Sequence, residues 1–113
     1  MQNEIPIIQK VYDFYCELYL AAEKMPKKDK YTLGEKLSRT TLDLMELLIM
    51  AGYADKEAKN IFLGKANAKL ELLKILIRLA EEIKAINTKK YLLLQEKLQE
   101  TGRMLGGWLR SLR

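Results

Sequence analysis

The stretch GRMLGGWLR, residues 102–110, combines three glycines, the only tryptophan of the chain and two arginines. Each glycine costs a helix about 1 kcal/mol relative to alanine, so three of them at the end of a leucine-rich segment require a reason. Gly102 and Gly106 share one helix face, where the absence of a Cβ lets a second helix approach. Trp108 adds a large amphipathic ring suited to contact surfaces. Two explanations are open, fraying of the helix end or close packing of a second helix, and we expect Gly102, Gly106, Gly107 and Trp108 to serve packing and assembly.

Upstream of this stretch, apolar residues recur at the three- and four-residue spacing of amphipathic helices. The first predicted helix begins near Pro6, because proline suits a first helical turn, and ends before Pro26. A second helix is predicted to begin in a capping box, with Thr32 as the N-cap and Glu35 reaching back to it. Gly52 is predicted to end that helix, since glycine is common just past a helix C-terminus.

Two further helices complete the pattern. Asp55 is the predicted N-cap of a third helix that ends near residues 86–87, and Thr88 is the predicted N-cap of the fourth. Four helices joined by short connections predict one all-α domain over residues 1–113, an up-down-up-down antiparallel four-helix bundle. The apolar faces are broader than one bundle core requires, and surplus apolar surface usually marks contact with another chain. We therefore expect a homo-oligomer.

The composition argues against an enzyme. The chain contains no histidine, which is the commonest general base and metal ligand, and its one cysteine, Cys16, can form neither an internal disulfide nor a zinc site. We predict no catalytic residue, no metal and no cofactor, and we expect Cys16 to pack as a small buried hydrophobe. The sequence shows no signal-peptide pattern and no apolar run of about 20 residues, so we expect a cytoplasmic protein without a membrane span.

The basic residues are the stronger functional signal. The net charge is +5 and the isoelectric point is about 9.3. Lysines cluster at 27–30 and at 89–90, and three arginines but no acidic residue follow Glu100. A basic balance suits a polyanionic partner, either nucleic acid or an anionic membrane surface, and contacts to phosphates would depend on salt and not on sequence. The alternative interpretation is an ordinary solvated lysine surface.

Three motifs together resemble one protein family. MPK at 25–27 followed by YTLG at 31–34, the pattern L-x-x-x-I-R-L-A at 73–80, and above all GRMLGGWL at 102–109 are similar to the accessory variability determinant protein of diversity-generating retroelements. That family belongs to a wider group of small four-helix bundles related to the proteins encoded by intervening sequences in bacterial 23S ribosomal RNA genes. The resemblance spans nearly the whole chain.

The resemblance implies a non-enzymatic partner of the retroelement's reverse transcriptase. It implies a ring-like homo-oligomer, a pentamer, whose basic surface binds the reverse transcriptase and nucleic acid, both RNA and DNA, to support mutagenic retrohoming. By this similarity the candidate contacts to phosphate or polymerase are Lys27, Arg39, Lys74, Arg78 and Arg103. Arg78 and Arg103 lie within matching motifs, whereas Arg39 and Lys74 are placed by charge. The alternative is a scaffold or interaction bundle of the intervening-sequence type with no nucleic-acid role, which the modest net charge and interspersed acids favour.

Overall fold

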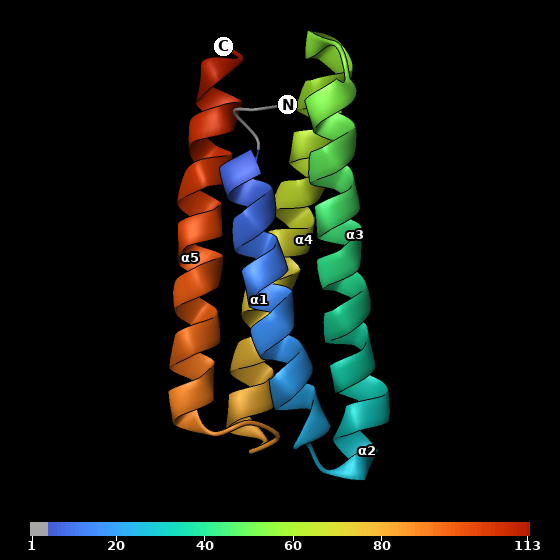
Figure 1. Cartoon of the computed structure of the whole chain (residues 1–113), viewed down its shortest axis with the longest axis vertical. Helices are drawn as coiled ribbons and strands as arrows, with labels where there is room; N and C mark the ends of the chain where they lie inside the picture. Colours follow the sequence, from blue (N-terminus) through green and yellow to red (C-terminus); the bar gives the residue numbers. More distant parts are fainter. Residues whose placement is uncertain (1–4) are drawn as a thin grey trace.

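The computed structural model describes residues 5–113, which form four long helices and one short helical connection. The long helices lie side by side, with the α3–α4 connection and the C-terminal end of α5 at one end of the molecule (Figure 1). The α1–α3 and α4–α5 connections lie at the opposite end. The elements are α1 (Ile5–Glu23), α2 (Lys27–Asp29), the π-helical η2 (Lys30–Gly34), α3 (Glu35–Tyr53), α4 (Lys56–Glu82) and α5 (Thr88–Ser111).

Each long helix packs against two others. Helix α1 contacts α3 and α5, and α4 contacts the same two helices from the other side. The buried residues follow the helical repeat on every helix, as Leu94, Leu98, Thr101 and Leu105 do on α5. The prediction of an all-helical fold with four long helices is therefore confirmed, and residues 5–113 contain no strand.

The predicted capping box at Thr32 and Glu35 is wrong. The backbone is already helical from Lys27, because α2, η2 and α3 follow one another directly after Pro26. The amides that a cap would satisfy are thus not at a helix end. The hydroxyl of Thr32 instead donates to the carbonyl oxygen of Lys28 at 2.8 Å.

Two of the motifs that carry the family resemblance, MPK at 25–27 and YTLG at 31–34, lie in contact in this segment. Gly34, the last residue of YTLG, is buried beneath the end of α1. A Cβ at this position would lie 3.2 Å from the sulfur of Met25, which begins MPK. The close approach explains why a residue without a side chain occupies a buried helical position.

The remaining helix ends confirm some predictions and correct others. Asp55 caps α4 as predicted, since its carboxylate accepts a hydrogen bond from the amide of Ala58 at 2.9 Å. Gly52 does not end α3, because the helix continues to Tyr53 and stops where Ala54 turns to extended backbone. No glycine within residues 5–113 has a positive φ.

The predicted cap of the last helix is off by one residue. Asn87 is the N-cap of α5, since its side chain accepts a hydrogen bond from the amide of Lys90 at 2.7 Å. The hydroxyl of Thr88 instead donates to Glu81 at 2.9 Å and ties the start of α5 to the end of α4.

Cys16 is exposed, which contradicts the prediction that it is buried. The core stripe of α1 passes through Phe14 and Leu18, both fully buried. Each residue advances about 100° around a helix, so a residue midway between these two points away from the core. The general tendency of cysteine to be buried is outweighed here by its position in the helical repeat.

Helix α4 ends at Glu82, earlier than predicted, in a Schellman motif. The amide of Ala85 donates to the carbonyl of Ala80 at 2.8 Å, and the amide of Lys84 donates to Glu81 at 3.0 Å. Ala85 and the residue after it are buried, which extends the apolar pattern beyond the helix. Lys84 occupies the left-handed position of the motif with φ 65°, where glycine is the usual residue.

This geometry predicts that Lys84→Gly stabilises the protein. The left-handed conformation costs a residue with a Cβ about 1–2 kcal/mol, partly offset by the greater entropy of glycine in the unfolded chain. We expect the free energy of unfolding, measured with urea, to rise by up to about 1 kcal/mol. The matched control is Lys89→Gly in the first turn of α5, which should lower it instead. A loss of stability in Lys84→Gly would contradict the prediction.

Candidate nucleic-acid interface

The five basic residues expected to contact phosphate or polymerase lie on four different helices. Lys27 begins α2, at the end of the bundle that holds the α1–α3 and α4–α5 connections. Arg39 is exposed on α3, Arg78 on α4 and Arg103 on α5. Lys74 is half-buried on α4. The five residues therefore do not form one cluster.

Three of the five residues, Lys74, Arg78 and Arg103, lie near the contact between α4 and α5. The Nζ of Lys74 lies 3.5 Å from the position that a Cβ on Gly102 would occupy. Arg78 lies one turn further along α4 on the same face, and Arg103 follows Gly102 on α5. The matching motifs at 73–80 and 102–109 thus belong to neighbouring surfaces.

Lys74 and Arg39 are partly neutralised by acids on their own helices. The Nζ of Lys74 lies 3.4 Å from Glu71, and Arg39 lies 3.9 Å from Glu35. Such exposed pairs contribute little to stability. They do reduce the positive charge that these residues present to a phosphate.

The glycine–tryptophan run is only lightly covered within one chain. A Cβ on Gly106 or Gly107 would meet the guanidinium of Arg110, at 3.3 and 3.8 Å, and no other side chain that the structure describes within 4 Å. Trp108 is half-buried against the core, with the Nζ of Lys59 5.7 Å from its ring centroid. Trp108 therefore joins the end of α5 to the start of α4, while no helix of the same chain packs closely on Gly106 and Gly107.

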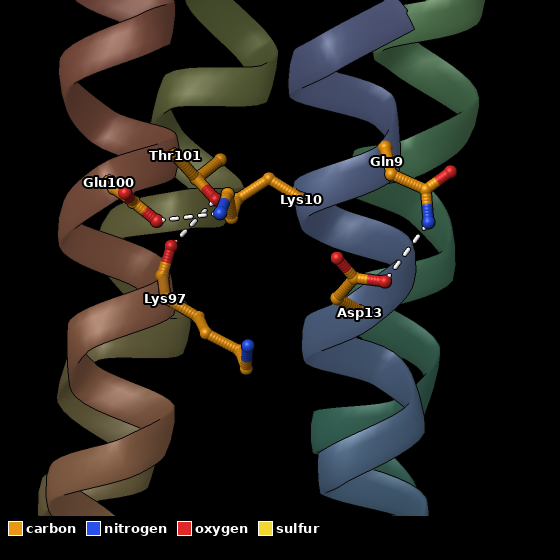
Figure 2. A network of polar contacts seen from close by, with 6 residues as sticks. All are labelled: Gln9, Lys10, Asp13, Lys97, Glu100 and Thr101. Carbon is orange, nitrogen blue, oxygen red and sulfur yellow. Dashed lines mark hydrogen bonds and ion pairs between the residues drawn. The ribbon is translucent and has the colours of Figure 1, made fainter.

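A polar network joins α1 to α5 along one side of the bundle (Figure 2). Lys10 and Glu100 form an ion pair of 2.7 Å, Gln9 donates to Asp13 at 3.0 Å, and the Thr101 hydroxyl donates to the Lys97 carbonyl at 2.8 Å. The hydrogen bond from Lys10 holds the pKa of Glu100 below its usual value. The same bond raises the pKa of Lys10, so that lysine remains charged but committed to its partner.

Other lysines on the sides of the bundle are also paired between helices. Lys69 lies 3.6 Å from Asp43 and links α4 to α3, and Lys90 lies 3.0 Å from Glu17 and links α5 to α1. These ion pairs keep the sides of the bundle close to electrical balance. The net positive charge of the chain must therefore lie elsewhere.

The excess positive charge lies in the two connections at one end of the bundle, in segments 24–34 and 83–90 (Figure 1). Together they hold seven lysines and one aspartate, a formal charge of +6, whereas the remainder of the chain holds 13 basic and 14 acidic residues. Within residues 5–113, six of these lysines form no ion pair. They are Lys24, Lys27, Lys28, Lys30, Lys84 and Lys89. We call this surface the basic end.

The sequence shows the lysine clusters of the basic end but does not show that they lie close together. The lysines at 27–30 and 89–90 were visible as separate clusters, and only Lys27 was selected as a contact. Lys24 and Lys84 were missed. The available signal was chain topology, because alternating helix directions place the first and third connections at the same end of a bundle.

The Lys10–Glu100 pair predicts a specific pH dependence of stability. The lowered pKa of Glu100 stabilises the fold above the ordinary carboxyl pKa of about 4.3, and this contribution is lost as the pH falls through the lower folded-state value. Glu100→Gln should therefore have a smaller free energy of unfolding than the wild type at pH 7, and the difference should shrink in acid. Glu46→Gln on the exposed face of α3 is the control. Parallel curves for Glu100→Gln and the wild type across this range would contradict the assignment.

The fold and this surface define a class of protein, a small all-helical bundle with a basic end. Residues 5–113 contain no group of three or more residues able to hold a metal ion, and none of their helices is long and apolar enough to cross a membrane. The sequence model described as bAvd-like matches residues 5–112, so the chain belongs to the bAvd-like family. The resemblance to the accessory variability determinant proteins is confirmed, and these are accessory proteins not known as enzymes. No curated protein matches the chain significantly.

Proposed function

We propose that this accessory protein binds RNA and DNA together with the reverse transcriptase of a diversity-generating retroelement, and that it supports mutagenic retrohoming without itself being an enzyme. The protein acts in the cytoplasm. The observation that carries the nucleic-acid part is the basic end, where the connections carry more positive charge than the whole chain. Family membership supports the reverse-transcriptase part.

The basic end is chemically suited to binding the sugar–phosphate backbone of a nucleic acid. Its cations are lysines, which act as point charges, and phosphate contacts carry no sequence information. Unpaired lysines on short connections would hold a strand without selecting its bases, which is what an accessory protein needs if the copied sequence varies. The net charge on the sides of the bundle is close to zero, where ion pairs such as Lys10–Glu100 join the helices. The basic end is therefore the part of the molecule that attracts a polyanion most strongly.

This proposal predicts salt-sensitive binding of single-stranded RNA and DNA. Fluorescence anisotropy with labelled oligonucleotides of unrelated sequence should give similar affinities, which fall steeply between about 50 and 200 mM salt. The double variant Arg78→Glu/Arg103→Glu should weaken binding more than the control Lys56→Glu/Arg113→Glu. The two control residues follow or begin helices at the end of the bundle away from the basic end. Equal affinities would reject Arg78 and Arg103 as contacts.

Absence of binding even at the lowest salt would contradict the nucleic-acid proposal as a whole. That result would favour the scaffold of the intervening-sequence type. Co-purification of the chain with its own reverse transcriptase would test the second partner separately.

We further propose that the chain is an up-down-up-down bundle that assembles into a ring-like homo-oligomer, a pentamer. Two separate apolar faces support assembly. One lies on the outer side of α4, where Ile61, Ile75, Leu79 and Ile83 are 42–57% exposed. The other lies over α1 and α3, with exposed Tyr12, Tyr19, Leu42 and Ile49. Contact between two different faces gives a heterologous interface, which forms a ring when the rotation closes.

The assembly can be tested with Ile75→Glu/Leu79→Glu. Both side chains already face solvent in the single chain, so the charges should not disturb the core. Light scattering should give a mass near 13.1 kDa for this variant and a multiple of it, five-fold for a pentamer, for the wild type. Circular dichroism checks that the variant is folded. A monomeric wild type would contradict the proposal.

Gly106→Leu separates the role of the glycines from that of the apolar faces. Only the flexible Arg110 side chain lies near this position within one chain, so the variant should fold. A loss of assembly would mean that a neighbouring chain packs on Gly106. Unchanged assembly would show that the glycine run serves something other than packing.

A further inference from the structure

The basic end contains a hollow of about 650 Å³ between the last turns of α1 and the α4–α5 connection. Its floor includes Ala21, Ala85 and Ile86, which are only 5–7% exposed. Its rim includes Lys24 and Lys84. The hollow therefore combines an apolar surface with two cations that come from segments far apart in the sequence.

The other charged residues around the hollow are largely committed to partners. Lys90 donates to Glu17 at 3.0 Å, and Glu81 accepts a hydrogen bond from Thr88 at 2.9 Å. Lys24 and Lys84 form no ion pair within residues 5–113, and neither do Glu81 and Glu82, the two acids of the lining. The hollow thus offers two unpaired lysines beside two carboxylates, within the end of the bundle that carries the excess positive charge.

Lys84 holds its position on the rim at a cost in backbone conformation. It has φ 65°, in the left-handed region, and the Schellman motif that ends α4 needs only a residue that tolerates this conformation. Glycine adopts the left-handed conformation more easily. Within residues 5–113, Lys84 forms no ion pair that would offset this conformational cost. The fold thus requires the left-handed conformation at this position but not a lysine, and strained residues of this kind are often found at functional sites.

We infer that this hollow binds one nucleotide unit of an RNA or DNA single strand. Lys24 and Lys84 contact its phosphate, and the sugar or base lies over the apolar floor of Ala21, Ala85 and Ile86. The volume is within the range of small-molecule sites, about 300–1,000 Å³. The inference rests on the proposed nucleic-acid binding and locates its strongest contact. It assigns that contact to Lys24 and Lys84, residues not chosen from the sequence.

The test compares Lys24→Ala/Lys84→Gly with a control of equal charge, Lys56→Ala/Lys65→Ala, whose exposed lysines lie on α4 outside the hollow. The assay is fluorescence anisotropy with a labelled single-stranded RNA oligonucleotide over a series of salt concentrations. Losing the contact to this one phosphate should lower the slope of log affinity against log salt by about 0.7 and weaken binding on the order of ten-fold at about 100 mM salt. The control should change affinity by about two-fold or less, because charges beyond the Debye length are screened.

Two further variants separate binding from folding. Lys84→Gly alone should bind the oligonucleotide more weakly although its melting temperature is equal or higher, a combination that a structural role would not produce. Glu82→Gln should bind more tightly, because it removes one of the two carboxylates from the lining. Equal affinity of the Lys24/Lys84 variant and its control, with a wild type that binds, would overturn this site and leave the proposed function standing. A wild type that binds no oligonucleotide at low salt would overturn both.

Discussion

Burial of one apolar stripe from each of four helices is the constraint on which the rest of this structure depends. Phe14 and Leu18 on α1, Leu44 on α3, and Leu70 on α4 are fully buried. Burial of a side chain of this size contributes about 1.5–3 kcal/mol, the largest favourable term available to a small domain without disulfide or metal. The stripes set the rotation of each helix about its axis, and this rotation decides which other residues face solvent.

The distribution of charge follows from that rotation. Residues that flank a stripe approach the neighbouring helix, so their charges are arranged as pairs, as in Lys10–Glu100 and Lys90–Glu17. The exposed lysines of the connections, such as Lys27, Lys84 and Lys89, form no ion pair within residues 5–113. Lysines can therefore collect there without disturbing the bundle. The separation leaves the sides of the molecule balanced and one end strongly positive, and it requires no unusual element in the fold.

The same constraint explains how far sequence patterns could predict this protein. Helix number and the α5 stripe follow directly from the apolar repeat. Asp55 could be recognised as a cap because the backbone really enters a helix there. Thr32 offered the same local signal within a backbone already helical, and only the structure reveals that difference. The basic end could not be seen from local patterns, because it joins segments separated by about half the chain and depends on which helix ends meet.

Two places oppose local preference with no compensating contact from other side chains of residues 5–113. Lys84 holds a left-handed conformation that glycine would adopt more easily, and its amine pairs with no acid of residues 5–113. Gly106 and Gly107 weaken the last turns of α5, although among residues 5–113 only the side chain of Arg110 lies near them. Natural sequences agree with their folds at most positions, and disagreements concentrate where function sets the residue. Both positions are consistent with the proposed binding of nucleic acid and the proposed assembly. Lysine at position 84 adds positive charge at the basic end, which suits a polyanion. Glycine at positions 106 and 107 removes side-chain bulk, which suits close packing of a second helix. These opposite chemical changes fit one protein that meets two kinds of partner at two different ends of its bundle.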